Sequence, residues 1–111
     1  MTDGSWGANM TQGMRAVGGK LAVNDGRISF APHGLDRSTG GKPFDRPLTE
    51  LVSIDVAPRT FNPLDGGLRK RLRLRLLDGA EALFVVSHPG EVGVRIGRSA
   101  EAAGGSPRID V

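Results

Sequence analysis

The chain has 111 residues, with 15 lysines and arginines against 12 acidic residues and a formal net charge of +3. This length fits one domain with a single hydrophobic core, and the charge favours anionic partners such as phospholipid headgroups, nucleic acid or acidic proteins. The absence of cysteine excludes disulfides, thiolate metal sites and thiol redox chemistry.

The first clear element is a β-hairpin over residues 20–30. Apolar residues alternate with polar or small ones on both sides of Asn24-Asp25-Gly26, a sequence that tolerates the positive φ of a tight hairpin turn. Residues 9–17 are expected to supply earlier strand material. Residues 42–47 are predicted to form a short edge strand, because Pro43 and Pro47 each lack an amide donor.

Two further strands have the alternation of a sheet with one buried face. Residues 52–56 place three β-branched side chains on one side. In Arg71-Leu72-Arg73-Leu74-Arg75-Leu76, the period of two puts leucines on one face and arginines on the other. Asp78-Gly79 predicts a hairpin turn, after which residues 83–86 return as an apolar strand.

A helix is predicted after Ser87-His88-Pro89, where proline occupies the first turn and Glu91 lies near the positive end. Val92, Ile96, Ala100 and Ala103 form one apolar stripe. Glycines within this helix cost roughly 1 kcal/mol each against alanine, so packing must hold it together. Residues 104–111 are expected to be a flexible tail.

One core is expected from these patterns, and its predicted members are Leu21, Val23, Ile28, Phe30, Val52, Ile54, Val56, Leu72, Leu74, Leu76, Phe84 and Ile96. The fold class is therefore mainly β with one C-terminal α-helix. No internal repeat is visible.

Several segments together resemble bacterial GRAM domains over roughly residues 8–102. The resemblance lies in Ala8-Asn9-Met10, Ala16-Val17-Gly18-Gly19-Lys20-Leu21, Arg27-Ile28-Ser29-Phe30-Ala31-Pro32-His33, Pro47-Leu48, Ile54-Asp55-Val56, Gly67-Leu68, Asp78-Gly79 and Phe84-Val85-Val86. The resemblance implies a pleckstrin-homology-like fold, a seven-stranded bent antiparallel barrel or sandwich capped by a helix, over residues 8–103. It also implies a lipid- or protein-binding module.

Pleckstrin-homology domains that grip phosphoinositides carry a basic cluster in their first hairpin loop. The corresponding stretch here, Met10 to Gly19, holds only Arg15, with Lys20 just beyond it. This departure from the pattern speaks against strong inositol-phosphate recognition.

The candidate binding surface is the basic run and the apolar loop before it. Arg69, Lys70, Arg71, Arg73 and Arg75 could contact several phosphates, each worth about 1 kcal/mol near an anionic surface. Phe61 and Leu64, with Pro63 and Leu68, could insert shallowly into a membrane or dock a partner. The alternatives are that the arginines are the solvated face of a half-buried strand, and that Phe61 and Leu64 fold back to close the barrel.

Catalytic and metal sites find no support in the sequence. His33 and His88 stand 55 positions apart, without cysteine or acids at ligand spacing, and Ser29 and Ser87 lack a nucleophile-elbow motif. We expect no deep pocket lined by two or more candidate catalytic residues. The glycine pairs before Lys20 and Lys42 lack phosphate-loop spacing, and are expected in a hairpin and a loop.

The favoured function is a non-catalytic module without a cofactor, attached peripherally to anionic phospholipid. The alternative is a protein-interaction adaptor that binds no lipid, while an enzyme subunit has no specific support. Sequence-specific nucleic-acid binding is disfavoured, because the chain has no tyrosine and few aromatic residues for stacking. Lacking a long apolar stretch or a signal-peptide pattern, the protein is expected to be cytoplasmic.

Overall fold

The computed structural model describes residues 4–60 and 67–111 and shows one eight-stranded mixed sheet with a long C-terminal helix. The mainly β class with one such helix is confirmed. The strands are β1 (Gly4–Gln12), β2 (Arg15–Asn24), β3 (Arg27–Pro32), β4 (Phe44–Pro47), β5 (Leu51–Ala57), β6 (Arg71–Leu76), β7 (Glu81–Val85) and β8 (Arg108–Asp110). The helical elements are α1 (Gly34–Ser38), the 3-10 turn η1 (Leu48–Glu50) and α2 (Pro89–Ala102).

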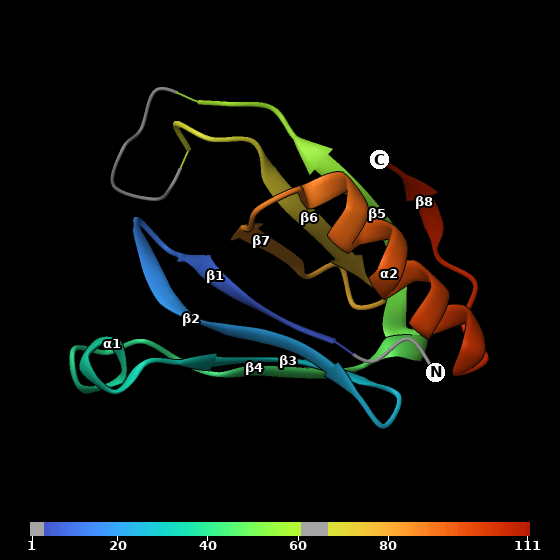
Figure 1. Cartoon of the computed structure of the whole chain (residues 1–111), viewed down its shortest axis with the longest axis horizontal. Coiled ribbons are helices and arrows are strands. Elements are labelled where there is room, and N and C mark those ends of the chain that lie inside the picture. The colour runs from blue at the N-terminus through green and yellow to red at the C-terminus, as the bar shows by residue number, and fades with distance from the viewer. Residues whose placement is uncertain (1–3, 61–66) are drawn as a thin grey trace.

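The strand order is β4-β3-β2-β1-β7-β6-β5-β8, and every neighbouring pair is antiparallel except β5 and β8. Figure 1 shows that β1 to β4 form one layer, while α2 covers strands of the other. Only Asn9 with Val85 and Met10 with Phe84 pair β1 to β7. The sheet therefore bends and opens at this junction.

The predicted hairpins are confirmed. Between β2 and β3, Asp25 and Gly26 both have positive φ, 52° and 73°, the combination that a tight two-residue hairpin turn requires. Gly79 has φ 87° between β6 and β7. The predicted edge strand is also present, because β4 pairs only with β3.

The leucine face of β6 is the centre of the core, with Leu72 and Leu74 fully buried. Ten of the twelve predicted core residues are buried. Val52 was predicted wrongly, since its side chain is 45% exposed. A register irregularity between Leu51 and Ser53 puts Leu51 in the core in its place, because one extra residue turns the following side chains to the opposite faces. Val56 is half-buried.

Helix α2 begins at Pro89 as predicted, and Val92, Ile96 and Ala100 are buried along its inner stripe. Ala103, the fourth predicted member of the stripe, follows the helix and is exposed. Trp6 of β1 also lies against this helix, with the Arg95 guanidinium carbon 5.3 Å from its ring centroid.

The prediction of a flexible tail at 104–111 was wrong, because β8 pairs in parallel with residues 53–55 of β5. Two helix glycines explain this. A Cβ at Gly97 would collide with the Ile109 side chain, and one at Gly93 would approach Cγ1 of Val111 to 2.9 Å. Because Gly93 and Gly97 have no side chains, β8 can lie against the helix. This strand is the eighth, one more than the seven that the resemblance to GRAM domains implies.

Candidate functional site

The three arginines of β6 do not form a uniform positive stripe. Arg73 makes a bidentate ion pair with Asp55 of β5, in which Nε lies 2.9 Å from Oδ1 and Nη2 lies 2.6 Å from Oδ2. Arg75 pairs with Glu81 of β7 at 3.1 Å. Arg71 is only 5% exposed, and its Nη1 donates a hydrogen bond to the hydroxyl of Thr11 at 3.0 Å.

The Arg73–Asp55 pair also shifts the protonation of both groups. The hydrogen bonds from Arg73 lower the pKa of Asp55, and those to Asp55 raise the pKa of Arg73. Each charge is held by its partner, so this pair contributes little net positive potential to the surface. The Arg73–Asp55 ion pair therefore stabilises the contact between strands β5 and β6, and it contributes less to the recognition of an anion.

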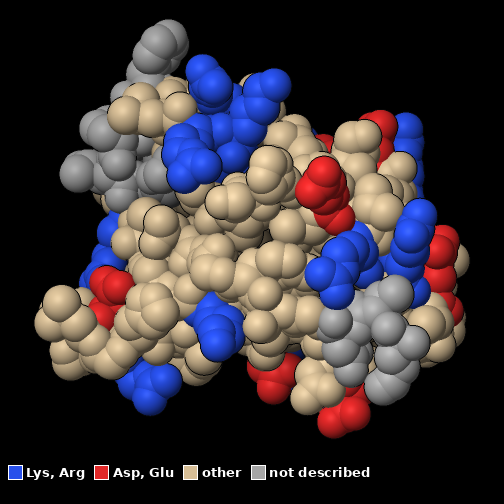
Figure 2. All heavy atoms as spheres, viewed as in Figure 1, with Lys and Arg blue, Asp and Glu red and all other residues tan. Residues whose placement is uncertain are grey.

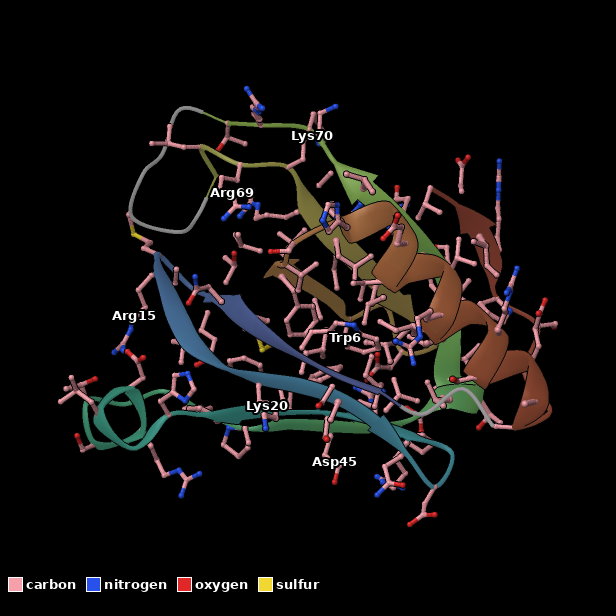
Figure 3. The ribbon with its side chains drawn as sticks, in the orientation of Figure 1. Trp6, Arg15, Lys20, Asp45, Arg69 and Lys70 are labelled. Atoms are coloured by element: carbon pink, nitrogen blue, oxygen red, sulfur yellow. The ribbon has the colours of Figure 1, made fainter. Side chains whose placement is uncertain are left out.

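Three exposed cations flank the connection between β5 and β6. Arg59, Arg69 and Lys70 are exposed, and none of them makes an ion pair with another described residue. Figure 2 shows Lys and Arg atoms gathered at this end of the molecule, and Figure 3 places Arg69 and Lys70 there on the segment that leads into β6. We call Arg59, Arg69 and Lys70 the basic end.

Only part of the predicted apolar surface lies within the described residues. Phe61, Pro63 and Leu64 lie outside the described residues. Leu68, which immediately precedes Arg69, is 54% exposed.

A cavity of about 500 Å³ opens between the β1–β2 turn and the segment before β4. Its apolar wall includes Met10, Pro43 and Phe44, and its rim carries Lys42, which has no ion pair with a described residue. Gln12 anchors the rim, since its side chain donates to the Lys42 carbonyl at 2.6 Å and accepts from the Lys42 amide at 2.8 Å. We call this cavity the mouth; the sequence patterns did not predict it.

A smaller hollow of about 240 Å³ lies on the outer face of β1, β2 and β7. It brings together His33, Ser87, Asn9 and Arg69, of which only Arg69 was a predicted binding residue. His33 and Ser87 share this lining, but the hollow is open and is not the deep pocket that the expectation concerns. No hydrogen bond within the described residues joins the imidazole of His33 or of His88 to an acid or a serine.

The two glycine pairs also lie in different settings from each other. Gly40 and Gly41 are in a loop, as predicted, with Gly40 at φ 101°. Gly18 and Gly19 lie in the hairpin of β2 and β3, as predicted, and within β2 they stand opposite Asn9 and Ala8 of β1. A Cβ at Gly19 would strike the Ala31 carbonyl, so close packing of β2 on β3 requires glycine there.

Most acids of the described chain serve as partners for arginines. Asp36 accepts from Arg15 at 3.4 Å and from the Gly18 amide at 3.1 Å, and Asp45 accepts from Arg27 at 2.9 Å. Arg46 pairs with both Glu50 and Asp78. In residues 4–60 and 67–111, no three potential ligands converge on a metal site.

Comparison with known proteins leaves the family open. No protein-family model matches the chain, and no curated protein matches it either. Within the described segments, none of the helices has the length and apolar character needed to cross a membrane.

Proposed function

We propose that this chain is a non-catalytic binding module of the pleckstrin-homology-like class that attaches peripherally to anionic membranes through the basic end. The single observation that carries the proposal is the contrast in pairing. Arg73 and Arg75 are neutralised by Asp55 and Glu81, whereas Arg59, Arg69 and Lys70 are exposed without an ion pair in the described parts of the chain.

The topology supports the fold part of the proposal. Strands β1 to β7 run antiparallel in the order β4-β3-β2-β1-β7-β6-β5, and α2 follows directly and packs against β5 and β6. A bent sheet closed by a C-terminal helix is what the resemblance to GRAM domains implies. The eighth strand is an addition to that pattern.

The expected affinity is low and sensitive to salt. Three cations worth about 1 kcal/mol each at an anionic surface give about 3 kcal/mol, less than the roughly 4 kcal/mol of a millimolar Kd. Leu68 and the apolar wall of the mouth add surface that can be buried against lipid. Binding therefore depends on a membrane that presents many anionic headgroups at once.

The test is co-sedimentation of the protein with phosphatidylcholine vesicles, with and without phosphatidylserine, at low salt and in 1 M NaCl. We expect binding only to the anionic vesicles at low salt, since the screening length falls to about 3 Å at 1 M. Equal sedimentation with neutral and anionic vesicles at low salt would contradict the proposal.

A protein-interaction adaptor is the second candidate function. It is favoured by β4, an edge strand whose outer side has no partner among the described strands and could pair with an extended peptide. The strand has only four residues and ends in Pro47, which makes it a weak template. This function leads if the vesicle experiment gives no anion-dependent binding.

A further inference from the structure

The hollow on the outer face lies where β1 and β7 separate. Their pairing ends at Asn9 and Val85, and continuing the same antiparallel register places Gly7 opposite Ser87. On the other side of β1, Gly18 of β2 lies opposite Asn9. The hollow, of about 240 Å³, is thus built over three strands rather than on one loop.

Two glycines form its floor. A Cβ added at Gly7 would meet nothing within 4 Å, so the space above this residue is open. A Cβ at Gly18 would come within 3.1 Å of the Asn9 side-chain oxygen and 3.0 Å of Asp36 Oδ2. Glycine within a strand weakens it and often marks a bulge, a bend, or a close approach of a ligand or of another backbone segment.

Four polar side chains surround this floor. Asn9, His33, Arg69 and Ser87 line the hollow and are exposed, and their side chains make no hydrogen bond with another described residue. The nearest acid, Asp36, does not line the hollow and already accepts from Arg15 and from the Gly18 amide. The lining therefore offers the Arg69 guanidinium, which has no ion pair among the described residues, and several further hydrogen-bond donors, while the Asp36 carboxylate beside Gly18 is already hydrogen-bonded.

We infer that this hollow binds a phosphate group. A guanidinium presents a planar fork of donors that fits phosphate oxygens in pairs, and phosphate offers enough acceptor oxygens to engage the remaining donors as well. The volume is below the roughly 300–1,000 Å³ typical of pockets for drug-sized ligands. This size favours a single phosphate group over a nucleotide. The site is separate from the mouth and does not require attachment to a membrane.

The test is a titration of the ¹⁵N-labelled chain with inorganic phosphate, followed by the amide resonances of Gly7, Gly18 and Ser87. We expect saturable shifts at these residues. Arg69→Gln should weaken the phosphate Kd by about tenfold or more, because it removes a charge-assisted hydrogen bond. Gly7→Val should abolish the shifts by filling the open space.

Two matched controls separate this site from general charge and from general effects of substituting glycine. Arg98→Gln removes an exposed cation of α2 that neither lines the hollow nor belongs to the basic end, and Gly90→Val fills a glycine of α2 that is likewise open to 4 Å. Both controls should keep the wild-type response to phosphate. Shifts that do not saturate, or that survive in a folded Gly7→Val variant and in Arg69→Gln, would overturn the inference.

Vesicles identify the source of the phosphate. If the ligand is a lipid phosphomonoester, the protein should prefer phosphatidate over phosphatidylserine at equal vesicle charge, and Gly7→Val should remove that preference. If the ligand is a free phosphate compound, Gly7→Val should lose phosphate binding while its vesicle binding is unchanged. If the wild-type protein binds vesicles but shows no response to phosphate, the inference that the hollow binds phosphate is wrong, while the proposal of membrane attachment is unaffected.

Discussion

At the scale of the residue, two neighbouring positions on β6 stabilise the fold in different ways, one by burial in the core and the other by an ion pair. Leu74 is fully buried opposite Ile54, while Arg73 is held by Asp55 one position away on the same pair of strands. The apolar pair supplies burial, and the ion pair fixes the register, since a slip of one residue would exchange the two faces.

Leu74→Ala tests the apolar half of this arrangement. Truncation of a buried leucine should lower the free energy of unfolding by about 2–5 kcal/mol, because it loses transfer energy and leaves a cavity. Urea denaturation measures the change. Val52→Ala is the control, because Val52 is 45% exposed, and its cost should be well below that of Leu74→Ala. A cost under about 0.5 kcal/mol for Leu74→Ala would mean that this face is not in the core.

The ion pair predicts how stability depends on pH. Arg73 lowers the pKa of Asp55 in the folded protein, so folding is favoured while this carboxylate is ionised. That contribution is present above the unfolded pKa of about 3.9 and is lost as the pH falls through the lower folded value. Asp55→Asn should therefore lower the free energy of unfolding at pH 7. Below about pH 4, this free energy should fall less steeply with decreasing pH than in the wild type.

Urea denaturation from pH 7 down to pH 2 measures this effect. Glu101→Gln, on an exposed acid without an ion pair among the described residues, should leave the acid-side slope as in the wild type. An unchanged slope in Asp55→Asn would show that the pair does not contribute to stability.

At the scale of the element, α2 and β8 depend on each other. Gly97 lacks a side chain where Ile109 of β8 packs against the helix. Within a helix, Gly→Ala normally gains about 1 kcal/mol, whereas overpacking costs about 1–3 kcal/mol. The sign of Gly97→Ala should therefore depend on residue 109.

We expect Gly97→Ala to destabilise the wild-type chain and to stabilise an Ile109→Ala chain. Unfolding of the four proteins in a double-mutant cycle measures the coupling between the two positions. If Gly97→Ala stabilises both backgrounds equally, β8 does not pack against α2 in solution.

The sequence predicts well those features that depend on local pattern. The hairpin at Asp25-Gly26, the leucine face of β6 and the start of α2 all follow from alternation, turn chemistry or proline position. The irregularity at Val52 and the pairing of β8 were missed, because each depends on contacts with residues distant in the chain. The glycines of α2 were the one sequence feature that pointed to β8. Glycine lowers helix stability relative to alanine, which suggested close packing on the helix, but the sequence did not identify the segment that packs there.

The same limit applies to the candidate site. The density of arginines in residues 69–75 identifies a basic segment, but not which of its charges are already paired. Asp55 is 18 positions from Arg73 in the sequence and directly opposite it in the sheet. The hollow was missed for a related reason, because Gly7, Gly18 and Ser87 meet only through the pairing of three strands.

At the scale of the whole molecule, we propose that the position of the charges, and not the net charge alone, directs the domain to anionic membranes. The double variant Arg69→Gln, Lys70→Gln removes two cations from the basic end. Its matched control, Arg98→Gln with Arg108→Gln, removes two exposed cations without ion pairs among the described residues from α2 and β8. Each variant lowers the formal net charge of +3 by two.

The most direct measurement is the fraction of each protein bound to phosphatidylserine-containing vesicles at low salt. Loss of two contacts worth about 1 kcal/mol each should weaken binding by about 30-fold in the variant of the basic end. The control should stay close to the wild type. Equal weakening of both variants would show that binding follows net charge, and would contradict the assignment of the basic end.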